Sequence, residues 1–139
     1  MRESAVNRLY QGLATVMRRR TELSNEVHPG ISLASYSMLT QIEPAPGIRA
    51  ADLAVLFGLD KSTVSRQLNE LEAAGLIRRD GERPGRRGAA LVLTPSGRRR
   101  LEQEAARARQ HLGERLAGWK ERDIEAFAQM VERFIDDLG

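Results

Sequence analysis

The chain of 139 residues contains no cysteine. That absence excludes disulfide bonds, thiolate metal sites and a redox sensor based on a thiol. Aromatic residues make up only 4% of the chain, so Leu, Val, Ile and Ala must fill the core of what we expect to be a single domain. No run of about 18 apolar residues is present, and the N-terminus lacks a signal-peptide pattern. We therefore expect a cytoplasmic protein without a membrane partner.

Patterns that would indicate catalysis or metal binding are also missing. The two histidines, His28 and His111, are far apart in the sequence, and no Gly-rich phosphate loop follows a strand. His28 precedes Pro29 and is expected in a loop, whereas His111 is expected at an exposed position of a helix. The sequence therefore predicts no enzyme, no cofactor and no metal site.

Residues 61–74 form a predicted helix with two opposed faces. Val64, Leu68 and Leu71 share one face by their spacing and can dock on a core. The other face presents hydroxyl, amide and guanidinium groups, which are the groups that contact base edges and phosphates in a major groove. Its residues are Ser62, Ser65, Arg66 and Asn69. A merely solvated face is the alternative, but such faces are usually richer in Glu and Lys.

The flanking segments favour a winged helix-turn-helix. A short apolar helix near residues 50–57 and a turn at Gly58 precede the two-faced helix, which Asp60 is expected to cap and Gly75 to end. Two apolar runs follow, at 76–77 and 91–93, and Gly and Pro between them predict a hairpin tip. Residues 78–100 hold eight Arg against two acids, a local net charge of +6 compared with +3 for the whole chain. Solubilising charge is the alternative, but this clustering favours a nucleic-acid contact.

Four segments resemble the MarR family of bacterial transcription regulators. They are Asp52-Leu53-Ala54, Lys61-Ser62-Thr63-Val64-Ser65-Arg66, Leu71-Glu72-Ala73-Ala74-Gly75-Leu76-Ile77 and Leu93-Thr94-Pro95-Ser96-Gly97. The resemblance implies a mainly α fold with a small β-hairpin wing, in which residues 31–97 form the DNA-binding lobe and residues 1–30 and 98–139 form helical dimerisation arms. This sequence departs from the family pattern at Gly85, a position where family members usually carry an Asp shortly before the wing arginine. The minor-groove residue is then expected to be Arg87, with Arg86 as the alternative.

The resemblance and the two-faced helix together imply a set of DNA contacts. In the recognition helix they are Lys61, Ser62, Thr63, Ser65, Arg66 and Asn69, with Arg66 and Asn69 reading bases and Lys61 near phosphate. In the wing they are Arg83, Arg86 and Arg87. The expected function is a homodimeric regulator, a repressor on a palindromic operator. The alternative is a winged-helix protein-interaction module without DNA binding.

Both ends of the chain carry amphipathic helices, expected over residues 4–25, after Thr94-Pro95 and near the C-terminus. Their apolar stripes either cover the domain's own core or form a homodimer interface, which we favour. The expected interface residues are Leu9, Leu13, Leu112, Leu116, Ile124, Phe127, Val131 and Phe134. Residues 121–139 carry six acids and two arginines, a net charge of −4, so this end is expected to repel DNA.

MarR-like proteins often bind a small aromatic or phenolic effector between the arms and the DNA-binding lobe. Residue type and expected position suggest Met17, His28, Tyr36, Met38 and His111 for such a pocket. Core packing is the competing interpretation, because Met commonly fills irregular gaps between helices.

Overall fold

A computed structural model describes residues 1–81 and 89–139. The elements are the helices α1 (Arg2–Arg18), α2 (Arg20–Val27), α3 (Leu33–Ile42), α4 (Ala50–Phe57) and α5 (Lys61–Ala73), the strands β1 (Ile77–Asp80) and β2 (Ala90–Leu93), and the helices α6 (Pro95–Arg115) and α7 (Glu121–Leu138). The predicted class, mainly α with a small β-hairpin, is confirmed. The prediction of a single helix over residues 4–25 was wrong, because the helix is interrupted at Arg19 and divides into α1 and α2.

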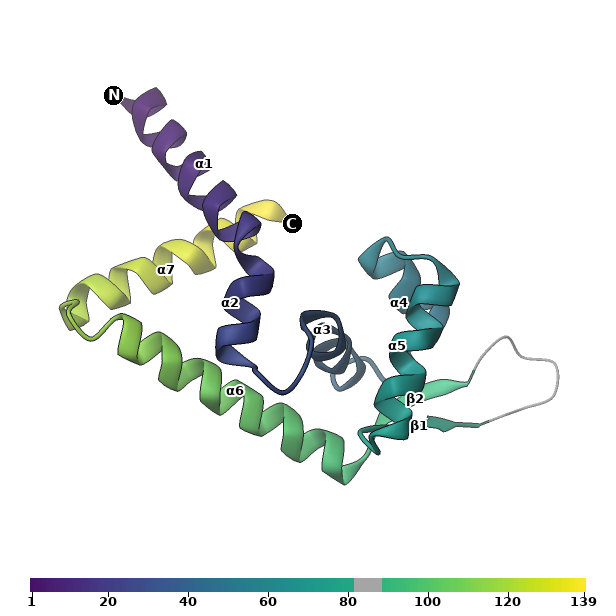
Figure 1. Ribbon diagram of the computed structural model, residues 1–139. Helices are drawn as coiled ribbons and strands as arrows, with labels where there is room; N and C mark the ends of the chain where they lie inside the picture. The colour runs from purple at the N-terminus through teal and green to yellow at the C-terminus, as the bar shows by residue number, and fades with distance from the viewer. Residues whose placement is uncertain (82–88) are drawn as a thin grey trace.

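The lobe formed by α3, α4, α5 and the hairpin lies to one side of the helical arms (Figure 1). Strands β1 and β2 are antiparallel, with Ile77 opposite Leu93 and Asp80 opposite Ala90. Ile48, just before α4, adds a backbone contact to this sheet, because its carbonyl accepts a hydrogen bond of 2.8 Å from the Leu91 amide. The hairpin is thereby joined to the start of the helix-turn-helix.

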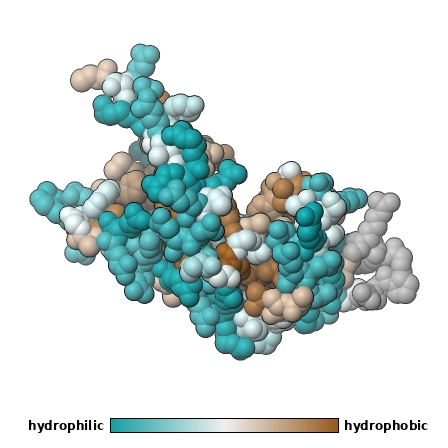
Figure 2. Space-filling view, viewed as in Figure 1, coloured by the Kyte–Doolittle hydropathy of each residue, from teal (hydrophilic) through white to brown (hydrophobic). Residues whose placement is uncertain are grey.

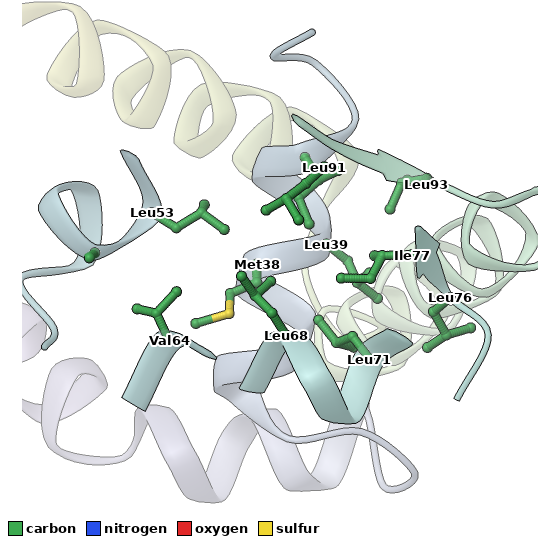
Figure 3. Close-up of a cluster of buried hydrophobic side chains, with 12 residues drawn as sticks. Met38, Leu39, Leu53, Val64, Leu68, Leu71, Leu76, Ile77, Leu91 and Leu93 are labelled. Atoms are coloured by element: carbon green, nitrogen blue, oxygen red, sulfur yellow. The ribbon is translucent and has the colours of Figure 1, made fainter. Parts of the chain in front are cut away.

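The hydrophobic core lies inside this lobe (Figure 3). Met38 and Leu39 of α3 meet Leu53 of α4, and Leu68 of α5 packs with them. The strands close the cluster with Ile77, Leu91 and Leu93. Burying aliphatic side chains of this size stabilises the fold by about 1.5–3 kcal/mol each. Aliphatic residues therefore fill the core, as the scarcity of aromatic residues required.

Helix α6 leaves the lobe from the hairpin and runs beneath α2, and α7 turns back from its far end (Figure 1). Thr94 caps α6 by accepting a hydrogen bond of 3.0 Å from the Gly97 amide, and Pro95 is the first helical residue, as predicted. Among the residues that the structure describes, no helix is both long enough and apolar enough to span a membrane.

Candidate nucleic-acid interface

Helix α5 is fixed at both ends by backbone-directed hydrogen bonds. At its start, Asp60 Oδ1 accepts from the Thr63 amide at 2.7 Å and from the Ser62 hydroxyl at 2.9 Å. Bonds from the Thr63 side chain and backbone and from Ser62 hold the pKa of Asp60 below its ordinary value of 3.8. At its end, Gly75 takes a left-handed φ of 74° and the Leu76 amide donates to the Leu71 carbonyl at 3.0 Å. Both predicted ends of the helix are therefore confirmed.

The two faces of α5 separate as their spacing predicted. Val64, Leu68 and Leu71 are buried against the core. The opposite face is exposed along Lys61, Ser62, Ser65, Arg66 and Asn69, while Thr63 is half-buried. A polar helix face backed by a rigid apolar core is the arrangement that a major groove accepts.

Asn69 is already engaged within the protein. Its Oδ1 accepts a hydrogen bond of 3.1 Å from Arg79 Nη2, and Arg79 Nε lies 3.5 Å from Glu72 Oε2. Arg79 belongs to β1, so one guanidinium joins the strand to two residues of α5 that are one turn apart. Sequence reasoning missed this contact, because it considers Arg79 only as part of the positive charge of residues 78–100 and not as a partner of α5.

The first strand also carries Arg78, whose Nη1 lies 3.2 Å from Asp80 Oδ1. The three wing arginines expected to contact DNA, Arg83, Arg86 and Arg87, lie outside the described residues. At the start of α4, Asp52 Oδ2 accepts a hydrogen bond of 2.9 Å from the Arg49 amide.

The five residues suggested for an effector pocket lie at different places in the described part of the chain. Met38 is in the core and Met17 of α1 is exposed. His28 and Tyr36 stack with ring centroids 4.1 Å apart. His111 is half-buried, with Nε2 3.8 Å from Glu26 Oε2. Only Met38 lines the open hollow described next.

An open, mainly apolar hollow of about 580 Å³ lies between α2, α3 and the α4–α5 turn. Leu33, Met38, Phe57 and Leu59 supply apolar surface, and Arg20 supplies a cation. Apolar walls with one charged group are typical of sites for small amphipathic ligands.

His28 lies in the loop between α2 and α3, as predicted, and its side chain is buried there. Its Nδ1 lies 2.6 Å from Glu104 Oε2, and Glu104 is 1% exposed. Arg100 Nε donates to Glu104 Oε1 at 2.9 Å, and Arg100 Nη2 donates to the Gly30 carbonyl at 2.9 Å. These contacts fasten α6 to the loop between α2 and α3.

Opposing effects act on the Glu104 carboxyl. Burial by itself would raise its pKa, but hydrogen bonds from His28 and Arg100 and the charge of Arg107 outweigh burial and hold the pKa below its ordinary value of 4.5. Sequence reasoning missed Glu104. The available signal was its position on the α6 stripe, three residues after Leu101 and one before Ala105. No group of three or more His, Asp or Glu residues suited to a metal ion occurs in residues 1–81 and 89–139.

The arm helices present apolar side chains to solvent in the single chain. Several of the residues expected at a dimer interface are exposed by 39% or more, namely Leu9, Leu13, Leu112, Phe127, Val131 and Phe134. Leu116 and Ile124 are half-buried. Figure 2 shows apolar surface on the arm side of the molecule as well as on the lobe. Patches of this kind on a small protein usually mark an interaction surface.

Comparison with known proteins agrees with the fold. A model of the MarR family matches residues 30–88. An uncharacterized HTH-type transcriptional regulator of Bacillus subtilis (strain 168), YxaD, is 31% identical over 89% of this chain and 91% of its own length. Apo MarR from E. coli superposes with a TM-score of 0.75 at 22% identity, covering 91% of this chain and 96% of that one. A MarR family protein of Mycobacterium tuberculosis, solved in complex with salicylic acid, superposes with a TM-score of 0.65 at 23% identity over 91% and 92% of the two chains.

Proposed function

Because the chain belongs to the MarR family of transcriptional regulators, we propose that it is a homodimer that binds a palindromic operator through α5. The observation that carries this proposal is the exposed polar face of α5, which stands opposite the buried Val64, Leu68 and Leu71. In the proposed complex each α5 enters a major groove, and half-sites lie about 10 bp apart, centre to centre. The protein acts on transcription rather than as an enzyme, in keeping with its curated relatives.

Within α5, we assign Arg66 and Asn69 to base readout and Lys61 to phosphate. A guanidinium matches the paired acceptors N7 and O6 of guanine, whereas an ammonium acts as a point charge toward phosphate. Replacing Arg66 with Ala should cost on the order of 1–3 kcal/mol at one base position. Replacing Lys61 with Ala should instead weaken binding to all sequences and reduce the salt slope by about one.

The experiment that tests the function is selection of bound fragments from genomic DNA, followed by gel shifts on the selected site. A two-fold symmetric site with the expected spacing supports the proposal. Equal affinity of Arg66→Ala and the unaltered protein for every operator variant contradicts the assignment of Arg66. If the protein binds no DNA even at low salt, a protein-interaction module becomes the better interpretation.

We assign the wing arginines Arg83, Arg86 and Arg87 to the flanking minor grooves. The support is the local charge of +6 over residues 78–100, since clustered arginines attract the phosphate backbone and enter narrow minor grooves. Changing the three to Gln should flatten the dependence of affinity on salt. An unaltered slope would remove the wing from the interface.

The dimer is proposed to form through α1, α7 and the far end of α6. Phe127 and Phe134 are seven residues apart on α7 and therefore lie on the same face of the helix. Their side chains are 51% and 42% exposed in the single chain. A second copy covers such a stripe symmetrically, which suits a two-fold operator. Sedimentation of the Phe134→Ser variant should yield monomer, while Ser96→Ala at the exposed start of α6 serves as control. A Phe134→Ser protein that remains dimeric would rule out this surface.

We further propose repression that is released by a small aromatic effector. The support is the salicylic acid bound to the M. tuberculosis relative and, in this chain, the apolar hollow with Arg20 at its edge. A ligand weakens operator binding only if it prefers a different spacing of the two heads. Salicylate should raise the melting temperature and reduce operator affinity. Stabilisation that is lost in Arg20→Gln would locate the carboxylate, and no stabilisation by any phenolic compound would contradict effector control.

A further inference from the structure

The link between β1 and α5 constrains one of the candidate base-reading side chains. Arg79 donates from Nη2 to Asn69 Oδ1 at 3.1 Å while its Nε lies 3.5 Å from Glu72 Oε2. Asn69 and Glu72 lie three residues apart, so they occupy neighbouring positions on one side of α5. The Arg79 guanidinium is therefore held by both Asn69 and Glu72, and it approaches Asn69 from the hairpin.

The chemistry of Arg79 determines which way the Asn69 amide faces. A guanidinium only donates hydrogen bonds, so the Asn69 atom that it contacts must be the carbonyl oxygen Oδ1. The amide nitrogen Nδ2, with its two N–H donors, is then directed away from Arg79. Asn69 accordingly offers donors to a partner, because Oδ1 is turned toward Arg79 and Nδ2 is turned away from it.

This orientation changes the base that Asn69 suits. A free Asn side chain pairs with adenine in two places, accepting from N6 through its oxygen and donating to N7 through its nitrogen. When Oδ1 is turned toward Arg79, the side of Asn69 that faces a base carries N–H donors, which do not match the N6 donor of adenine. Guanine presents two adjacent acceptors, N7 and O6, and both are satisfied by N–H donors.

We propose that Arg79 is a positioning residue that orients Asn69 as a hydrogen-bond donor and thereby selects guanine over adenine at one base pair of each half-site. This inference rests on the proposed binding of α5 to DNA. Arg79 itself contacts no base in this scheme. Its effect on sequence preference passes through Asn69 alone.

The test compares base preference rather than affinity alone. Arg79→Met removes the donors but keeps an unbranched side chain, so the Asn69 amide is free to turn and present Oδ1 to adenine. The ratio of affinities for guanine and adenine at the Asn69 position should fall on the order of tenfold, about the size of one lost or gained base contact. The matched control is Arg78→Met, which removes the same charge from the adjacent residue of β1, where Arg78 pairs with Asp80. Arg78→Met should weaken binding to all operator variants equally.

A second variant keeps the link to the strand but removes the donor. Asn69→Asp still offers an oxygen to Arg79, and its other oxygen replaces the N–H donors, so the preference for guanine should disappear while the melting temperature is maintained. Unchanged base preference in both Arg79→Met and Asn69→Asp overturns the inference. If the unaltered protein selects a palindromic site in that experiment, the proposed function still stands. If the unaltered protein selects no sequence at all, the proposed function fails first and this inference fails with it.

Discussion

Gly97 occupies a position where one added carbon atom should destabilise the whole lobe. It is the third residue of α6, and a Cβ built on it would lie 2.0 Å from the carbonyl oxygen of Leu76 and 3.0 Å from the carbonyl carbon. That same oxygen accepts a hydrogen bond of 3.1 Å from the Thr94 amide. The obstacle is backbone rather than a flexible side chain, so it cannot rotate out of the way.

The cost of Gly97→Ala follows from the displacement that it requires. A carbon and an oxygen in contact are about 3.3 Å apart, so α6 must move from β1 by about 1.3 Å. Such a shift breaks the Thr94–Leu76 bond and the bond of 2.6 Å from the Thr94 hydroxyl to the Gly75 carbonyl. Each lost bond costs about 1 kcal/mol and overpacking costs about 1–3 kcal/mol, while the better helix propensity of Ala returns about 1 kcal/mol. We expect a net loss of about 2–4 kcal/mol.

Urea unfolding followed by circular dichroism measures this loss, at a fixed protein concentration because the proposed dimerisation would also contribute to stability. The matched control is Gly113→Ala in the same helix, where an added Cβ meets nothing within 4 Å. That control should be stabilised by up to about 1 kcal/mol through helix propensity alone. Equal stability of the two variants would refute the argument that the approach of α6 to Leu76 is what requires glycine.

Two further substitutions test the electrostatic contacts. Glu104→Gln should cost on the order of 2 kcal/mol of folding stability at neutral pH, because it weakens charged hydrogen bonds in a buried site. Since the folded-state pKa of Glu104 is lowered, this stability is present above pH 4.5 and is lost as pH falls through the folded-state pKa. Urea titrations should therefore show less acid destabilisation in the variant than in the unaltered protein. Asp60→Ala should lower both the melting temperature and operator affinity by fraying the start of α5. Asp60→Asn retains an acceptor for the Thr63 amide, so its melting temperature should be nearly unchanged. An equal loss of melting temperature in both variants would mean that the cap is not responsible.

The sequence predicted the helix-turn-helix because its signals are local. The buried positions of α5 recur at helical spacing, Asp60 and Gly75 mark its ends, and apolar runs mark both strands. The break at Arg19 was not predicted, since neither Pro nor Gly occurs near it, and nothing in the local sequence explains it. The DNA contacts themselves remain predictions, and those of the wing lie outside the described residues.

Contacts between distant segments were beyond local patterns. His28 and Glu104 are separated by 76 residues, so no spacing rule connects them. Pro29 correctly predicts a loop position for His28, but it gives no sign of the buried hydrogen bond to Glu104. Asn69 and Arg79 are only ten residues apart, but a chain reversal at Gly75 is what brings them together. Interpreting each side chain within its own element therefore missed these two pairs, each of which connects distinct segments.

These connections bear on how the arms and the lobe can move. Near its start α6 is held at Leu76 through Thr94, and further along it is held to the α2–α3 loop by Glu104 and Arg100. Arg115 at its last turn contacts Glu26 of α2 at 2.8 Å. A boundary between lobe and arm at residue 98 would cut through this fastened helix. In the proposed dimer, we therefore expect a change in the spacing of the two lobes to move each α6 together with its own lobe, with the adjustment taken up beyond residue 115, where α7 turns away.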